Sequence, residues 1–295
     1  NLLEYFSPLQ ISIILSTSRL VGIKCPGLYS IYTELNLSFC AVNECTTLEY
    51  GVEKFNKRFG KVLISLLAPG SEGFIQAFIR PKEREQSNFL EIKKKVNEDE
   101  FRYQSALIIG GSRGLGEVTV KLLAAGSADV KLTYHQGEED ANRIVKEINS
   151  NGGTANCFQY DVLSPDQDSF YNALNDWRPT HLYYFATPFI FSGTKGIFSD
   201  ILFKKFCDYY ISGFINIINM LRPLELRNIF YPSSIAIDEL PSNMGEYVSA
   251  KIAGEMLCMF FEQNYNDITI YRPRLPRMDT DQTVSLFPVK NEDPV

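Results

Sequence analysis

The chain has 295 residues, of which 45% are hydrophobic and 22% are charged, with a formal net charge of −6. The length predicts about two domains. The ordinary balance of apolar and charged residues argues against global disorder, a collagen-like repeat and a membrane bundle. The acidic balance disfavours nucleic acid as a partner, because a surface that binds phosphate backbones is usually basic.

The cysteines and histidines do not form the pattern of a metal site. The six cysteines contain no CxxC pair and the chain has only two histidines, so we expect neither a metal site nor a disulfide scaffold. Scattered thiols fit a reducing compartment, and we expect a cytoplasmic protein without a membrane partner. The chain begins with Asn1, without the basic flank of a signal peptide. This start predicts that the natural chain begins further upstream.

Residues 1–81 have the pattern of a small α+β unit. A helix is expected over residues 9–21. The following stretches alternate loosely between apolar and polar residues and are separated by Gly and Pro turn signals, a pattern that predicts antiparallel strands. These strands are expected at residues 30–39, 48–55, 61–67 and 73–80.

Residues 82–104 are expected to form a charged linker between two domains. The segment is dense in charged residues and has only weak apolar periodicity around Phe89, Leu90, Ile92 and Val96. This predicts a solvated linker with a short helix. The basic run at 93–95 has acidic neighbours on both sides, so a cancelled surface charge is favoured over a basic binding site.

From residue 105 to residue 295, short apolar strands alternate with helical segments. Such alternation predicts right-handed βαβ units and a doubly wound parallel sheet. A sheet of this kind binds ligands at the carboxyl ends of its strands. Strands are expected at 105–110, 129–134, 154–160, 181–186, 227–232 and 267–273, and helices at 115–125, 138–149, 200–221 and 246–263.

A glycine-rich turn follows the first of these strands. Gly110, Gly114 and Gly116 have the spacing GxxxGxG within IGGSRGLG. Glycine lets the backbone turn tightly and approach a pyrophosphate, while the first amides of the next helix point at the charge. Such turns also join strands to helices for packing alone, but this position in a βαβ series favours nucleotide binding.

The residues after the second strand favour NADP(H) over NAD(H). An acid at the end of this strand would bond the ribose 2′-hydroxyl of NAD, but residues 134–136 contain none. Arg113 in the glycine turn can face a 2′-phosphate, with a plain surface role as the alternative. Glu138 and Glu139 follow closely and keep NAD open as the other cofactor.

A tyrosine and a lysine lie one helical turn apart in the segment 246–263. Tyr247 and Lys251 therefore share a face of the predicted helix, although such a pair is more often a solvated helix face. A nearby ammonium lowers the pKa of a phenol, which would make Tyr247 a general acid or base for a carbonyl and alcohol pair. Ser234 follows a predicted strand and can hydrogen-bond the carbonyl oxygen, with Ser233 as the alternative.

Together these motifs resemble the short-chain dehydrogenase/reductase family over residues 105–273. The glycine turn, Ser234, the Tyr247–Lys251 pair and the acid that follows the third strand all match that family's pattern. The resemblance implies a Rossmann-type fold and hydride transfer from NADPH to a carbonyl. Ser234 and Tyr247 would polarise and protonate the oxygen.

The same resemblance implies which residues hold the cofactor. Asp161 would contact the adenine, Ala186 lies where the family has a stretch beside the cofactor, and Lys251 would also hold the nicotinamide ribose hydroxyls. The full implied set is Gly110, Ser112, Arg113, Gly114, Leu115, Gly116, Asp161, Val162, Ala186 and Lys251.

The segment departs from the family pattern at three points. Tyr210 stands where the family often has an Asn of a proton relay, which predicts a rerouted or impaired relay. Arg274 replaces the Gly of the usual Pro-Gly, and Arg274 and Arg277 are expected either to face an anionic group or to form surface ion pairs. The family's final strand is not recognisable after residue 273.

Residues 1–81 resemble part of a MaoC-like hot-dog domain, a family that includes enoyl-thioester hydratases. The resemblance is carried by residues 20–31 and by the segments LSFCAV and LEYGVEK. Hydratase chemistry there uses an Asp and a His, and no His precedes His135. The resemblance therefore implies a structural or acyl-binding module rather than a working hydratase.

These observations predict an NADPH-dependent reductase that acts on a 3-oxoacyl thioester or a similar small keto substrate. One alternative is a catalytically impaired binding protein with the reductase fold. Another is a fragment of a bifunctional hydratase/reductase. The apolar helices predicted at 200–221 and 246–263 leave a homo-oligomer open.

Overall fold

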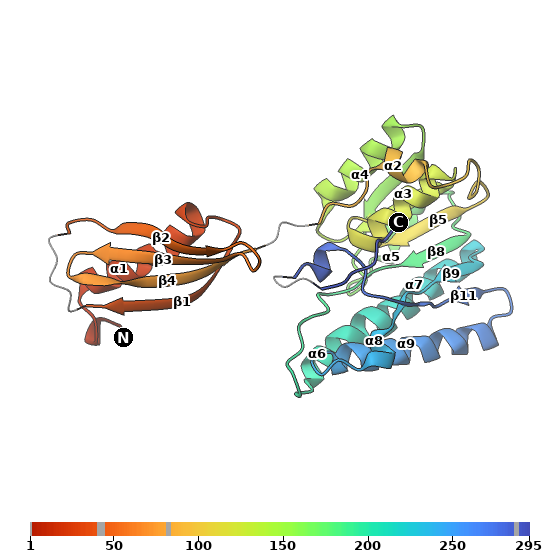
Figure 1. The fold of residues 1–295 in the computed structure, drawn as a ribbon. Helices are drawn as coiled ribbons and strands as arrows, with labels where there is room; N and C mark the ends of the chain where they lie inside the picture. The colour runs from red at the N-terminus through yellow and green to blue at the C-terminus, as the bar shows by residue number, and fades with distance from the viewer. Residues whose placement is uncertain (1, 40–44, 81–83, 286–288) are drawn as a thin grey trace. The chain divides into compact units, whose positions relative to one another are not determined.

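The computed structural model describes residues 2–39, 45–80, 84–285 and 289–295. The chain forms two compact units (Figure 1): Asn1–Glu83 with Val284–Val289, and Arg84–Thr283 with Lys290–Val295. Within these described ranges, no helix combines the length and the apolar character needed to cross a bilayer.

The first unit is a four-stranded antiparallel sheet with one α-helix. Helix α1 (Pro8–Arg19) begins at a capping box formed by Ser7 and Gln10. In the third strand every second residue is buried, because alternate side chains of a strand point to opposite faces. The helix and the antiparallel strands lie where the sequence predicts them, while the hot-dog family stays a prediction. The sheet order is β1-β4-β3-β2, with β1 Ser30–Ser38, β2 Glu49–Asn56, β3 Lys61–Ala68 and β4 Ser71–Ile79.

The second unit contains a six-stranded parallel sheet, which confirms the predicted α/β fold. From the central strand β5 the chain first builds toward one edge and then returns to build toward the other. A crevice forms at such a reversal, at the carboxyl ends of the strands. The order is β11-β9-β8-β5-β6-β7, with β5 Ser105–Ile109, β6 Asp129–Tyr134, β7 Thr154–Gln159, β8 His181–Tyr184, β9 Asn228–Phe230 and β11 Thr269–Tyr271.

Helices cover both faces of this sheet (Figure 1). Successive side chains of β5 point to opposite faces of the sheet and contribute to both hydrophobic cores. Leu107 packs in one cluster and Ile108 in the other. One face carries α3 (Gly114–Ala125) and α4 (Glu138–Ser150). The other face carries α5 (Gln167–Leu174), α7 (Phe214–Leu221) and α9 (Gly245–Asn264), with α6 (Asp200–Cys207) joined to α7 by a π-helical turn at Asp208–Gly213.

The segment predicted as a solvated linker is packed into the second unit. Its short helix α2 (Phe89–Lys93) is present, but Phe89 and Ile92 are fully buried against the core of α3 and α4. The buried amine of Lys121 donates to the carbonyl of Ser87 over 3.0 Å and so holds the start of this segment. The sequence did not predict this packing, because it depends on only two apolar side chains within a segment that is otherwise mostly charged.

We expect Phe89→Ala to destabilise the second unit by about 3–5 kcal/mol, because it removes a fully buried aromatic side chain. Leu90 is 53% exposed on the same helix. Its replacement by alanine is the control and is expected to change the free energy of unfolding by less than about 0.5 kcal/mol. Denaturant unfolding measures both values. Equal losses in the two variants would contradict the packed arrangement.

Candidate active site

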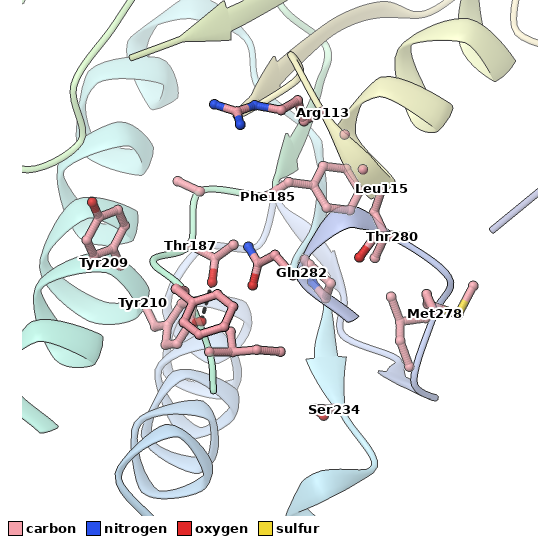
Figure 2. A pocket seen from close by; sticks show the side chains of 18 of the residues that line it. Arg113, Leu115, Phe185, Thr187, Tyr209, Tyr210, Ser234, Met278, Thr280 and Gln282 are labelled. Atoms are coloured by element: carbon pink, nitrogen blue, oxygen red, sulfur yellow. Dashed lines mark hydrogen bonds between the residues drawn. The ribbon is translucent and has the colours of Figure 1, made fainter. Parts of the chain in front are cut away.

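A cavity of about 720 Å³ lies at the carboxyl ends of the central strands. It is lined by every residue that the sequence singled out for cofactor binding or catalysis, from the glycine turn to Lys251. Figure 2 shows Arg113 near one end of this cavity and Ser234 near the other. Residues that are far apart in the sequence are thus brought into one site.

The glycine turn after β5 needs glycine at Gly110, Gly114 and Gly116. Gly110 and Gly114 have φ angles of 80° and 57°, in the left-handed region that favours glycine. A Cβ at Gly116 would lie 2.1 Å from the carbonyl oxygen of Gly110. Helix α3 begins at Gly114, and the residues of its first turn, Gly114, Leu115 and Gly116, line the cavity.

Arg113 is the cation of this turn. Its side chain is 54% exposed and its Nε lies 3.5 Å from the carboxylate of Asp140. The residues of the neighbouring turn that line the cavity are His135, Gln136 and Gly137, and Asp161, which also lines it, lies 3.7 Å from the ring nitrogen of His135. This end of the cavity thus offers the guanidinium of Arg113 together with carboxylates close by.

Two of the predicted catalytic residues lie on α9, and the third lies on the short strand β10 (Ser233–Ser234). The hydroxyl of Ser234 accepts the amide of Ala236 over 3.2 Å and lowers the pKa of Tyr247 through a side-chain interaction. The alternative, Ser233, donates its hydroxyl to Glu255 over 2.5 Å instead. Ser234 is therefore the serine whose hydroxyl faces Tyr247.

The amine of Lys251 is buried among tyrosine rings. Its Nζ donates to the carbonyl of Pro232 over 2.7 Å and lies 4.0 Å from the ring centre of Tyr210. The rings of Tyr231 and Tyr247 are 5.1 and 5.9 Å away. The electron-rich faces of these rings and one carbonyl oxygen are the partners of the ammonium.

Burial dominates the protonation of both residues. It lowers the pKa of Lys251 to about 7, against smaller opposing effects of Cys258 and Glu255. Burial also raises the pKa of Tyr247, and the hydrogen bond with Ser234 only partly opposes this. The expected lowering of the phenol pKa is not found for this chain by itself, because burial raises the pKa of Tyr247 and the ammonium of Lys251 is not among the groups that lower it.

Tyr210, at the position of the expected relay residue, forms a wall of the site. Its hydroxyl is 2.5 Å from the hydroxyl of Thr187, a contact that Figure 2 marks. Burial raises its pKa well above the ordinary value, so the phenol keeps its proton at neutral pH. Tyr210 lies in the π-helical turn between α6 and α7, which the sequence did not predict.

The residues after β11 were expected to hold an anionic group or surface ion pairs. Arg274 forms ion pairs with Glu255 and Asp238. Arg277 lines the cavity instead, with its guanidinium 4.8 Å from the ring centre of Phe191. The two arginines therefore have different roles, which sequence reasoning could not separate.

Sequence reasoning missed part of the cavity wall. Thr280 and Gln282 lie opposite the glycine turn, and a Cβ at Gly114 would be 3.5 Å from Thr280. In the part of the chain that the structure describes, Gln282 Oε1 is a buried oxygen without a hydrogen-bond partner. No spacing rule marks these residues, since they follow the last strand in an irregular segment. The apolar part of the wall includes Phe189, Ile190, Phe191, Met244 and Met278.

We expect Lys251→Met to raise the stability of the second unit more at about pH 6 than at about pH 9. The folded protein holds this amine with a pKa near 7, below the ordinary value of 10.5. Between these values the unfolded chain binds the extra proton, so the stability of the wild type rises with pH. Melting temperatures of both proteins measure the difference. A difference that does not change with pH would contradict the burial of the amine.

Part of the second unit is similar in sequence to known proteins. Residues 104–178 match the short chain dehydrogenase family. A 3-oxoacyl-[acyl-carrier-protein] reductase of Synechocystis sp. is 41% identical over 64 residues, which are 22% of this chain and 26% of that protein. Versicolorin reductase of Emericella nidulans is 39% identical over 61 residues, 21% of this chain and 23% of that protein. The chain thus spans about a quarter of the length of the curated relatives it matches.

Solved structures share the fold at low identity. The oxidoreductase yciK of E. coli has a TM-score of 0.59 at 17% identity and covers 67% of this chain and 87% of its own. A short chain dehydrogenase of Burkholderia cenocepacia in complex with NADP has a TM-score of 0.54 at 24% identity, with 62% and 77% covered. The family match covers residues 104–178, and the solved structures show the fold of the second unit.

Proposed function

We propose that the second unit is an NADPH-dependent reductase of a carbonyl compound, with a 3-oxoacyl thioester or a similar keto compound as its substrate. The observation that carries this proposal is one cavity that joins the glycine turn to Ser234, Tyr247 and Lys251. A dinucleotide laid along it from Arg113 toward Ser234 would present its nicotinamide to the proposed catalytic groups.

The residues of the cavity fit such a cofactor. The amides at the start of α3 suit a pyrophosphate, and Arg113 suits a 2′-phosphate, which favours NADPH over NADH. Asp161 and Val162 would contact the adenine end, and Ala186 the middle of the cofactor. When bound, NADPH supplies the hydride.

Side chains of the protein would supply the proton that the substrate oxygen receives. Ser234 would hydrogen-bond the substrate oxygen, and Tyr247 would donate its proton to that oxygen. The raised pKa of Tyr247 keeps this phenol protonated at neutral pH, which suits a proton donor in the direction of reduction. Lys251 would hold the ribose hydroxyls, and its pKa near 7 lets it carry a proton in part of the molecules.

The substrate class rests on the cavity wall and on similarity. Phe189, Phe191 and Met244 give the cavity an apolar side that suits an acyl chain. A 3-oxoacyl-[acyl-carrier-protein] reductase is among the matching relatives, and angucycline C-6 ketoreductase LanV, solved with NADP, shares the fold with a TM-score of 0.56. The first unit, if it binds acyl groups as its hot-dog resemblance implies, would serve the same substrate.

Tyr210 favours a second candidate, a binding protein with the reductase fold that has little turnover. Its hydroxyl is engaged with Thr187, and its ring lies against the amine of Lys251. A relay through this position would need a water or another route. Tight NADPH binding without reduction of any β-keto thioester or small ketone would favour this candidate.

We expect Tyr247→Phe to lower kcat for NADPH oxidation with a β-keto thioester by at least about 100-fold, because the proton donor is lost. Binding of NADPH, followed by its fluorescence, should stay within about twofold of the wild type. Undiminished turnover in this variant would refute the role of Tyr247.

We expect Arg113→Ala to raise the KM for NADPH by about tenfold or more, since charge-assisted hydrogen bonds to a phosphate are lost. NADH has no 2′-phosphate, so its KM should hardly change and serves as the internal control. Steady-state kinetics with both cofactors measure the ratio. An equal rise for both would place Arg113 away from the 2′-phosphate.

A further inference from the structure

A cluster of charged and polar side chains lies behind Ser234. Glu255, one helical turn beyond Lys251 on α9, accepts hydrogen bonds from Ser233 and from two nitrogens of Arg274 at 2.9 and 2.7 Å. Arg274 also forms an ion pair with Asp238 over 2.6 Å. The Arg274 hydrogen bond lowers the pKa of Glu255, so its carboxylate stays charged.

This cluster forms hydrogen bonds along one side of the two-stranded ribbon of β10 and β12 (Arg274–Leu275). Strand β10 pairs in parallel with β12, and Ser233 is opposite Arg274 in the register. Both side chains bond the same carboxylate of Glu255. Because neighbouring side chains in a strand point to opposite faces, Ser234 is turned the other way, toward Tyr247.

The same helix holds the residue just before this pair. The carbonyl of Pro232 accepts the amine of Lys251, and Ser233 bonds Glu255. Two side chains one turn apart on α9 therefore hold two successive residues of the segment that carries Ser234. A slip of one residue here would exchange Ser233 and Ser234.

We propose that Glu255 and Arg274 are positioning residues, which lock β10 against α9 so that Ser234, Tyr247 and the amine of Lys251 meet at the same point of the cavity. The catalytic part of this inference rests on the proposed reductase function. Neither residue needs to touch the substrate for this role. The replacement of the family's glycine by Arg274 then has a function in the site, through Glu255.

The test compares two glutamates on the same helix in the full chain. Glu262 also forms an ion pair, with Arg272, and accepts the amide of Ile270, but it does not touch β10. We expect Glu255→Gln to lower kcat by about tenfold to a hundredfold, the effect of a misplaced catalytic group. The KM for NADPH should change less, and Glu262→Gln should leave kcat within about twofold.

Two variants of Arg274 provide a second test of the proposal. Arg274→Gln should lower kcat as Glu255→Gln does. Arg274→Lys keeps the charge but loses the two-pronged contact with the carboxylate, so its kcat should fall between that of Arg274→Gln and the wild type. Equal losses of kcat in Glu255→Gln and Glu262→Gln would overturn the proposal, because they would show a general effect on the helix.

A readout without turnover separates this inference from the proposed function. The titration of Lys251, followed by NMR on protein with isotope-labelled lysine, reports the surroundings of its amine. The phenols of Tyr210, Tyr231 and Tyr247 and the thiol of Cys258 face this amine, and Glu255 is the nearby carboxylate that raises its pKa.

Glu255→Gln should shift this titration to lower pH, and Glu262→Gln should not. If the wild type reduces no carbonyl compound but this difference is seen, the proposed function fails while the placement of Glu255 close to the amine stands. If neither variant shifts the titration, the positioning role of Glu255 is contradicted whether or not the chain has activity.

Discussion

The site depends on the interactions of the buried amine of Lys251. A charged amine is costly to bury unless it is paired, and here its hydrogen-bond partner is the carbonyl of Pro232, among three phenol rings. These partners come from the π-helical turn, from the end of β9 and from α9 itself. A change in their packing would expose the amine to solvent or leave it buried without a partner. The pKa of the amine therefore depends on how these elements pack.

The position of this amine follows from the topology of the sheet. The chain reverses its direction of strand addition between β7 and β8, and β8 pairs with the central strand β5. The carboxyl ends of β5 and β8, and the segment after β9, therefore open into one crevice. The glycine turn and the proposed catalytic groups share this crevice although they are far apart in the chain.

The desolvation that lowers the pKa of Lys251 also raises that of Tyr247. A neutral phenol next to an amine that is only partly protonated is a proton donor at neutral pH. The same arrangement would be a poor base without a further charge to stabilise the phenolate. The protein chain alone therefore holds Tyr247 in its protonated form, which is the form that the proposed proton donor needs.

The sequence predicted the parallel sheet, the antiparallel strands of the first unit and the glycine turn, because these depend on local periodicity and on backbone geometry at Gly110, Gly114 and Gly116. It could not predict the sign of the shift at Tyr247, which depends on burial by elements distant in sequence. The packing of Phe89 was hidden by a charged context.

Two further features of the site were not predicted because no local pattern marks them. Arg274 and Arg277 have the same residue type and a similar sequence context, yet one pairs with Glu255 and the other lines the cavity. The wall formed by Thr280 and Gln282 belongs to an irregular segment. Only the tertiary arrangement distinguishes these roles.

The most direct test of the account is the transfer of deuterium from NADPH labelled at the reactive carbon of the nicotinamide to a 3-oxoacyl thioester. Mass spectrometry of the product should find one deuterium on the carbon that bore the keto oxygen, with the wild-type chain and not with Tyr247→Phe. Unlabelled product, or no product from any β-keto thioester or small ketone while NADPH is bound, would contradict the central claim that this cavity carries out hydride transfer.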